Sequence, residues 1–236
     1  VSFDAGANWQ PMAGTSPETA KVGLPVVPIH DLVVVGDELL VCTHGRAFWI
    51  LDDLTLVRQL AGDNESDAAR LFQPKDTVRS TRLSGFGNAE VPGRNYLFVG
   101  GIVQTYIPVK DQWGQTRRRF LDAGHNPDDG VVFYYILPEA PKEPVSLTIF
   151  DAAGAEIRAF RSKPLASGAG NDTNETYIPS LAGLNRFVWN MRHADAVKLM
   201  AKGGDQPSTV GPRAIPSDYE ARLSVGQTEL SQRFTI

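Results

Sequence analysis

The amino-acid sequence predicts a mainly β protein, and two observations support this fold class. Short segments rich in valine, isoleucine, leucine and aromatic residues recur along the 236-residue chain, separated by turns that contain glycine or proline. Asp218–Val225 also alternates polar and apolar residues, as a half-buried strand does. Only residues 195–202 have helical potential, and that segment is short.

Three strands are expected near the N-terminus, over Ile29–Val35, Glu38–Thr43 and Ala47–Leu51. The intervening segments are short and contain Gly36 and Gly45, which supply the positive φ that tight turns need. The pattern therefore predicts an antiparallel meander.

Six further strands are expected after residue 130. Their spacing of about ten residues, with glycine and proline turns between them, predicts a β-sandwich of about 100 residues. The expected strands are Val131–Leu137, Val145–Phe150, Glu156–Arg161, Arg186–Met191, Tyr219–Val225 and Glu229–Ile236. Residues 61–95 are more polar and are interpreted as a linker or a long surface excursion.

The composition excludes several classes of protein. With 23 basic and 27 acidic residues the net charge is −4, which argues against a broad nucleic-acid surface. Arg117–Arg119 form the basic run, interpreted as a solvated strand or loop. No apolar run approaches the ~20 residues of a membrane-spanning helix. The single cysteine, Cys42, rules out an intramolecular disulfide and is interpreted as a buried inert thiol.

The first nine residues contain a spaced motif, Ser2, Asp4, Gly6 and Trp9. Short polar side chains at Ser2 and Asp4 are suited to accept hydrogen bonds from loop amides. Gly6 permits a left-handed backbone, and the large apolar face of Trp9 is expected to fold back over the turn. The motif therefore predicts a rigid β-hairpin turn.

This S-x-D-x-G-x-x-W motif resembles the Asp-box, or bacterial neuraminidase repeat, which lies between the third and fourth strands of a β-propeller blade. The T-H-G-R-x-x-W-x-L-D-D run over residues 43–53 is similar to the last blade of bacterial sortilin-like (Vps10-type) Asp-box propellers. Residues 183–190 and 211–219 resemble the immunoglobulin-like module of the flagellar hook-capping protein. Ser217 departs from that pattern, which usually has glycine there.

The resemblance implies an organisation into three parts. Residues 1–60 would be the end of a β-propeller, residues 61–125 a connecting segment, and residues 126–236 an immunoglobulin-like β-sandwich. The chain would be the C-terminal region of a larger secreted or periplasmic protein, with a structural or binding role. Its partners would be the rest of the propeller or another copy of the chain, through exposed strand edges, and a glycan or protein ligand.

Catalysis is not expected from this chain alone, and no cofactor is predicted. The weak catalytic candidates are polar residues at strand ends: His30, Asp31, His44, Arg46 and Asp53. Hydrogen bonding between blades and capping of strand ends are the favoured interpretations of these residues. The alternative interpretation is a glycoside hydrolase, similar to sialidases with this repeat, whose active site lies mostly in blades outside this chain.

Two further sets of residues are weaker candidates. Asp128 and Asp129 could hold a cation, but the turn at 125–130 lacks the spacing of a calcium loop, so a rigid turn is favoured. Trp113 and Tyr134 are candidates for stacking against a ligand, with core packing as the alternative. No metal site is predicted from the four scattered histidines.

Overall fold

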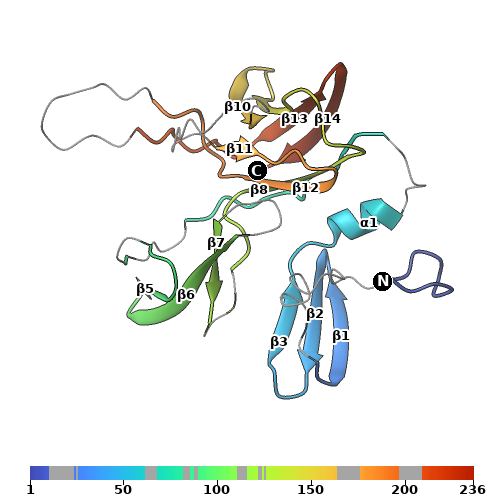
Figure 1. Cartoon of the computed structure of the whole chain (residues 1–236), viewed down its shortest axis with the longest axis vertical. Helices are drawn as coiled ribbons and strands as arrows, with labels where there is room; N and C mark the ends of the chain where they lie inside the picture. The colour runs from blue at the N-terminus through green and yellow to red at the C-terminus, as the bar shows by residue number, and fades with distance from the viewer. Residues whose placement is uncertain are drawn as a thin grey trace, which may run out of the picture. The chain divides into compact units, whose positions relative to one another are not determined.

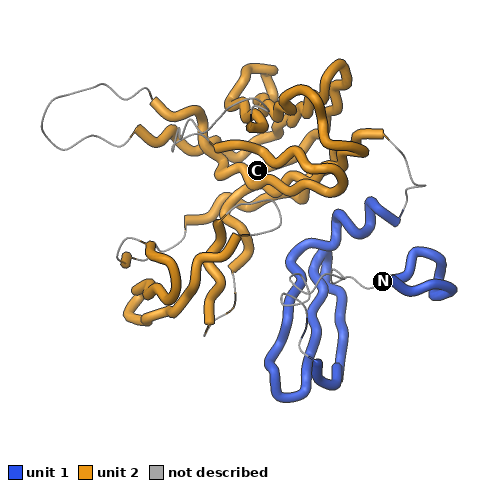
Figure 2. Tube along the Cα trace, viewed as in Figure 1, with its two compact units in different colours: residues 1–65 blue, residues 66–236 orange. Residues whose placement is uncertain are grey.

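The computed structural model describes residues 1–10, 24, 26–61, 68–81, 86–87, 90–110, 116–121, 124, 126–163, 176–196 and 209–236. The chain divides into two compact units, Val1–Glu65 and Ser66–Ile236 (Figure 2). The described residues are mainly β with one short helix, which confirms the predicted fold class at that level (Figure 1).

Unit 1 contains a three-stranded antiparallel meander followed by a short helix. The strands are β1 (Ile29–Val35), β2 (Glu38–Thr43) and β3 (Phe48–Leu51), in that order across the sheet. All three strands were predicted, β1 and β2 with the observed bounds. Helix α1 (Thr55–Ala61) was not predicted. Arg58 ties it to the β1–β2 turn, donating hydrogen bonds to the Asp37 carboxylate and to the Gly36 carbonyl.

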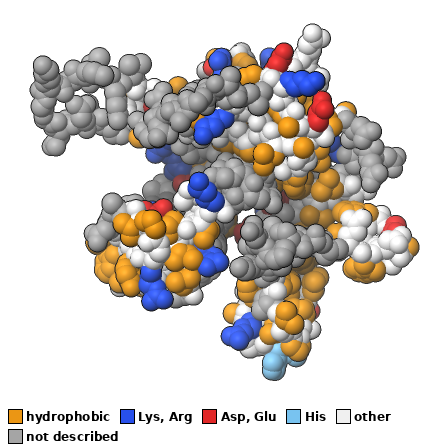
Figure 3. Space-filling model, in the orientation of Figure 1, with side chains coloured by type: hydrophobic (Ala, Val, Ile, Leu, Met, Phe, Trp, Pro, Cys, Tyr) orange, Lys and Arg blue, Asp and Glu red, His pale blue; other side chains and the backbone are white. Residues whose placement is uncertain are grey.

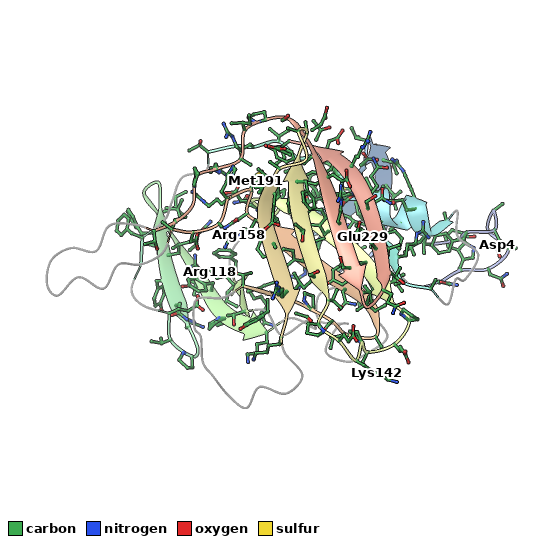
Figure 4. The ribbon with its side chains drawn as sticks, turned by 90° about the horizontal axis from the view of Figure 1, so that it is seen from above. Asp4, Arg118, Lys142, Arg158, Met191 and Glu229 are labelled. Carbon is green, nitrogen blue, oxygen red and sulfur yellow. The ribbon has the colours of Figure 1, made fainter. Side chains whose placement is uncertain are left out.

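Unit 2 is built from three sheets. A five-stranded sheet has the order β11-β10-β9-β13-β14, a three-stranded sheet has the order β12-β8-β4, and a second three-stranded sheet has the order β5-β6-β7. The strands of the first two sheets are β4 (Arg70–Leu71), β8 (Val131–Leu137), β9 (Ser146–Asp151), β10 (Glu156–Ser162), β11 (Tyr177–Ile178), β12 (Gly183–Trp189), β13 (Asp218–Val225) and β14 (Thr228–Thr235). In Figure 4, Arg158 marks β10 and Glu229 marks β14, the last strand of the five-stranded sheet.

These two sheets share one hydrophobic core. Every second residue of β8 is buried, and the same alternation continues on β9, β12 and β13. Trp189 at the end of β12 is fully buried and meets Tyr219 and Phe234 edge-on, with ring centroids 6.0 and 6.2 Å away. Its indole N–H donates to the Arg192 carbonyl at 2.9 Å, so the polar atom of this large side chain is also satisfied.

Residues 61–125, expected to be a connecting segment, contain a sheet that the sequence did not predict. Strands β5 (Asn95–Val99), β6 (Ile102–Lys110) and β7 (Thr116–Phe120) form an antiparallel sheet inside the expected connecting segment. Gly100 and Gly101 both have positive φ and make the tight β5–β6 turn. Phe86 extends the sheet through an isolated bridge to Phe98. The run Arg117–Arg119 therefore lies on a strand of a defined sheet.

Two strands begin with the same hydrogen-bonded turn. Asn185 accepts a hydrogen bond from the Leu181 N–H and donates to the carbonyls of Leu181 and Gly183. Asn95 repeats this arrangement with Val91 and Gly93, at nearly the same distances. Both asparagines are buried and both glycines have positive φ. The spacing glycine-x-asparagine thus marks the start of β12 and of β5.

Replacement of Trp189 by alanine is expected to destabilise unit 2 by about 3–5 kcal/mol, because it removes a fully buried aromatic side chain and leaves a cavity. Urea unfolding of the full chain, followed by far-ultraviolet circular dichroism, measures the change. The matched control is Leu184→Ala on the same strand, where the side chain is partly exposed and a change under about 1 kcal/mol is expected. Equal effects of the two substitutions would contradict the assignment of Trp189 to the core.

Candidate functional site

The first ten residues form a closed loop held by side-chain hydrogen bonds. Val1 and Gln10 exchange backbone hydrogen bonds in both directions, at 2.7 and 2.8 Å, as antiparallel neighbours do. Inside the loop, Ser2 Oγ accepts from the Gly6 N–H and donates to Asp4 Oδ1, both at 2.8 Å. Gly6 has a φ of +93°, and the Trp9 ring lies 4.0 Å from the point where a Cβ on Gly6 would sit.

Asp4 is the central acceptor of this loop. Its Oδ1 accepts from the Asn8 backbone N–H at 2.8 Å, and its Oδ2 accepts from the Asn8 side-chain amide at 2.6 Å. These bonds, with the one from Ser2, lower the pKa of Asp4 from 3.8 to about 2. The charged carboxylate is therefore the form that organises the loop.

The five weak catalytic candidates lie in unit 1, and contacts join only two of them. His30 Nε2 and His44 Nδ1 are 2.9 Å apart, so one imidazole donates a hydrogen bond to the other. A shift in register between Ile29 and Asp31 brings the histidine on β1 opposite the turn that follows β2. Asp31 accepts from the neighbouring Leu32 N–H. The Arg46 carbonyl accepts from the Trp49 indole N–H at 2.9 Å.

Asp53 holds the start of α1. Its Oδ1 accepts from the N–H and from the hydroxyl of Thr55, the first residue of the helix, at 2.8 and 2.6 Å. A carboxylate in this position satisfies amide groups that have no acceptor within the helix and interacts favourably with the helix dipole. The geometry therefore gives Asp53 a local structural role.

The sheet of unit 1 is apolar on both faces. The register places Leu32 and Val34 on one face with Trp49, and Val33 and Ile50 on the other. All five side chains are between 39% and 57% exposed. Within the described part of this sheet, Val41 is the one buried hydrophobic side chain. Strands that are apolar on both sides are typical of sheets covered on both sides.

Asp128 and Asp129, the cation candidates, pair with arginines. Asp128 forms ion pairs with Arg186 and, at 3.5 Å, with Arg117. Asp129 accepts from Arg213 Nη2 through both carboxylate oxygens, at 3.1 and 3.3 Å. Burial alone lowers the pKa of Arg186, but Asp128 and Tyr134 outweigh it and raise the pKa above its ordinary value. The two carboxylates thus neutralise guanidinium groups that anchor the start of β8.

Of the two candidates for stacking against a ligand, Tyr134 and Trp113, the structure describes Tyr134. Tyr134 lies half-buried on the outer side of β8, where its hydroxyl accepts from Arg186 Nε at 3.2 Å and the guanidinium lies over its ring. One face of this ring is therefore already in contact with a cation. Trp113 lies outside the described residues.

The sequence interpretation missed a second surface, on the β5-β6-β7 sheet. Arg94, Tyr96 and Phe98 alternate along β5 and its start, so they project to the same side. Figure 3 shows hydrophobic side chains interspersed with Lys and Arg on this part of the protein. The alternate spacing of Arg94, Tyr96 and Phe98 could have indicated this surface, but these residues lie in a segment that was interpreted as a connecting segment.

The described residues contain neither a cluster that could hold a metal ion nor a helix that could cross a membrane. Among the residues that the structure describes, no cluster of three or more histidine, cysteine, aspartate or glutamate side chains has an arrangement that could hold a metal ion. The one helix in the described ranges is too short to cross a bilayer.

Comparison of the chain with protein-family models, with curated proteins and with solved structures gave no match.

Protonation of Asp4 is expected to open the N-terminal loop only at strongly acidic pH. Because folding lowers the pKa of Asp4, the loop is stabilised above the unfolded pKa of about 3.9 and loses that stabilisation as pH falls through about 2. The Asn8 amide resonance, followed by NMR from pH 5 downward, should therefore titrate with a midpoint of about 2. A midpoint near 4, or an unchanged Asn8 amide in Asp4→Asn, would contradict this geometry.

Proposed function

We propose that this chain is the non-catalytic C-terminal region of a secreted or periplasmic Asp-box propeller protein similar to bacterial sortilin-like proteins. In this proposal β1-β2-β3 belongs to the last blade, and its role is to pack against the rest of the propeller. The sandwich of unit 2 would be an immunoglobulin-like module that presents a surface to a glycan or protein ligand. The observation that carries the proposal is the exposure of apolar side chains on both faces of the unit 1 sheet.

The two apolar faces support a covered position in a larger assembly. A lone antiparallel sheet in water usually keeps one face polar, whereas a propeller blade is covered by a neighbour on each side. Complete burial of one valine, leucine or isoleucine side chain contributes about 1.5–3 kcal/mol. Burying even Leu32, Val33, Val34 and Ile50 would therefore add several kcal/mol, which gives this sheet a strong tendency to acquire partners.

The closed N-terminal loop also fits the proposal. An Asp-box connects two antiparallel strands, and Val1 and Gln10 exchange the hydrogen bonds of such a pair. The bonds made by Ser2 and Asp4 account for the polar positions of the motif. Gly6 accounts for the glycine position through its positive φ.

Two features of unit 2 support an immunoglobulin-like module. Tyr219, near the start of β13, donates its hydroxyl hydrogen to the Ile215 carbonyl at 2.5 Å. A tyrosine that bonds the backbone a few residues upstream is a recurring feature of that fold, as is a buried tryptophan between the two sheets. Trp189 occupies such a place, in contact with Tyr219. Burial raises the pKa of Tyr219 and so further disfavours loss of the proton that makes this hydrogen bond.

The alternative of a glycoside hydrolase receives less support from the geometry. Hydrolysis of a glycosidic bond ordinarily needs two carboxyl groups that flank the substrate. Asp31 and Asp53 instead accept hydrogen bonds from adjacent backbone amides, and no contact joins either carboxylate to the His30–His44 pair.

Self-association through the unit 1 sheet is the expected behaviour of this chain by itself. Lysine at Val34 or at Ile50 would place a charge on one apolar face or the other, so each substitution should weaken association about tenfold or more. Size-exclusion chromatography with light scattering, over a range of concentrations, measures the dissociation constant. Val78→Lys in unit 2, where the valine is 87% exposed, is the control. A monomer at every concentration would count against a sheet that needs covering.

Chromogenic glycosides test the alternative directly. We expect no hydrolysis above background by the full chain, because the carboxylates of Asp31 and Asp53 already accept hydrogen bonds from nearby backbone amides. Measurable turnover that Asp31→Asn or Asp53→Asn abolishes would overturn the non-catalytic assignment. Thermal unfolding of each variant would show whether lost activity reflects lost folding.

A further inference from the structure

One face of the β5-β6-β7 sheet combines exposed aromatic rings with exposed arginines. Tyr96 is 58% exposed and Phe98 is 37% exposed, and they stand two residues apart on β5. The Phe86 ring lies beside Phe98, with ring centroids 4.9 Å apart. Val103 on β6, which pairs with Phe98, is also more than half exposed. The face therefore carries an apolar strip that water contacts.

Two arginines flank this strip at one end. Asn95 pairs with Tyr106, so Arg94 stands opposite Ile107, and Ile107 in turn pairs with Arg119 on β7. The row Arg94–Ile107–Arg119 thus runs from the residue before β5, across β6, to β7, with about 10 Å between the outer backbones. Both arginines are exposed, and neither forms an ion pair with another described residue.

The other two arginines of the run are engaged elsewhere. Arg118, which is labelled in Figure 4, points to the opposite face of the sheet. There its guanidinium lies over the Tyr106 ring at 4.8 Å and pairs with Glu90 at 3.4 Å. Arg117 pairs with Asp128 at 3.5 Å. Strand alternation places Arg117 and Arg119 on one side of β7 and Arg118 on the other. Because Arg117 is engaged by Asp128, Arg119 is the arginine of the run that joins Arg94 on the aromatic face.

We propose that this face, here called the Arg94–Arg119 face, binds an anionic polysaccharide, a polymer carrying carboxylate or sulfate groups. Guanidinium groups form paired hydrogen bonds with carboxylates and sulfates, and their charge is retained at every physiological pH. The Tyr96 ring offers an apolar plane on which the C–H face of a sugar ring packs. This inference deepens the ligand-binding part of the proposed function. It does not depend on the propeller assignment, which the self-association experiment tests separately.

Charge distinguishes this ligand from a nucleic acid. Residues 86–121 contain five basic residues and two acidic ones, although the whole chain has a net charge of −4. A nucleic-acid surface neutralises many phosphates over a broad positive area, whereas here only Arg94 and Arg119 are free among the arginines described on this sheet. Two cations beside exposed aromatic rings suit a polymer with widely spaced charges.

Affinity electrophoresis of the full chain in native gels tests the proposal. The probes are hyaluronan, heparin, neutral dextran and a single-stranded oligothymidylate. We expect hyaluronan or heparin to retard the chain, dextran to have no effect, and the retardation to weaken as salt is raised. The double variant Arg94→Gln/Arg119→Gln should bind about a hundredfold more weakly, and Tyr96→Ala about tenfold more weakly.

Arg118→Gln is the matched control, because it removes a neighbouring charge from the opposite face of the same sheet. Its affinity should stay within about twofold of the unmodified chain, and circular dichroism should show all variants folded. Three results would each overturn the proposal. They are absence of binding to either polyanionic sugar, an equal loss of binding in Arg118→Gln, and tighter binding to the oligothymidylate than to the polysaccharides.

Discussion

The burial of alternate residues along β8 is the constraint on which most of unit 2 depends. Val131, Phe133, Tyr135 and Leu137 point into the core, so the residues between them must point outward. Tyr134 is one of these, and it meets Arg186 from the paired strand β12. Core packing thereby sets the position of the Arg186 guanidinium, which forms an ion pair with Asp128. Asp128 in turn pairs with Arg117 of β7. The β5-β6-β7 sheet is thus anchored by a contact whose geometry originates in the core.

In unit 1, strands β1 and β3 do not show the alternating burial that organises β8. The strands of this unit are apolar on both sides, and apart from Val41 the hydrophobic side chains described there remain at least partly exposed. Side-chain hydrogen bonds nevertheless hold both turns. Arg58 ties α1 to the first turn, and Thr43 Oγ1 donates to the Ala47 carbonyl across the second. The described part of this sheet is therefore organised mainly by its turns and its backbone hydrogen bonds, because its exposed apolar side chains contribute little hydrophobic stabilisation.

Much of the strand pattern was predictable, because it is encoded by local alternation and by glycine turns. The bounds of β1, β2 and β8 were predicted correctly for this reason. The β5-β6-β7 sheet was missed because Pro108 is unfavourable inside a strand and because the three consecutive arginines of β7 leave no alternation of apolar and polar residues. Helix α1 has only seven residues, too few to show a clear helical period.

The candidate site was less predictable, because it depends on register between strands. Neither the His30–His44 contact nor the Arg94–Ile107–Arg119 row can be derived from spacing along one strand. The sequence nevertheless contains a local signal for the β5 side of the Arg94–Ile107–Arg119 row. The glycine-x-asparagine spacing that begins β12 also occurs at Gly93 and Asn95, and both asparagines bond the backbone four residues before them. Since a buried asparagine in this turn fixes where the strand starts, the spacing alone predicts that residues 94, 96 and 98 share a face. A hydrogen-bonding requirement of the backbone thus identifies a surface that hydrophobic periodicity does not reveal.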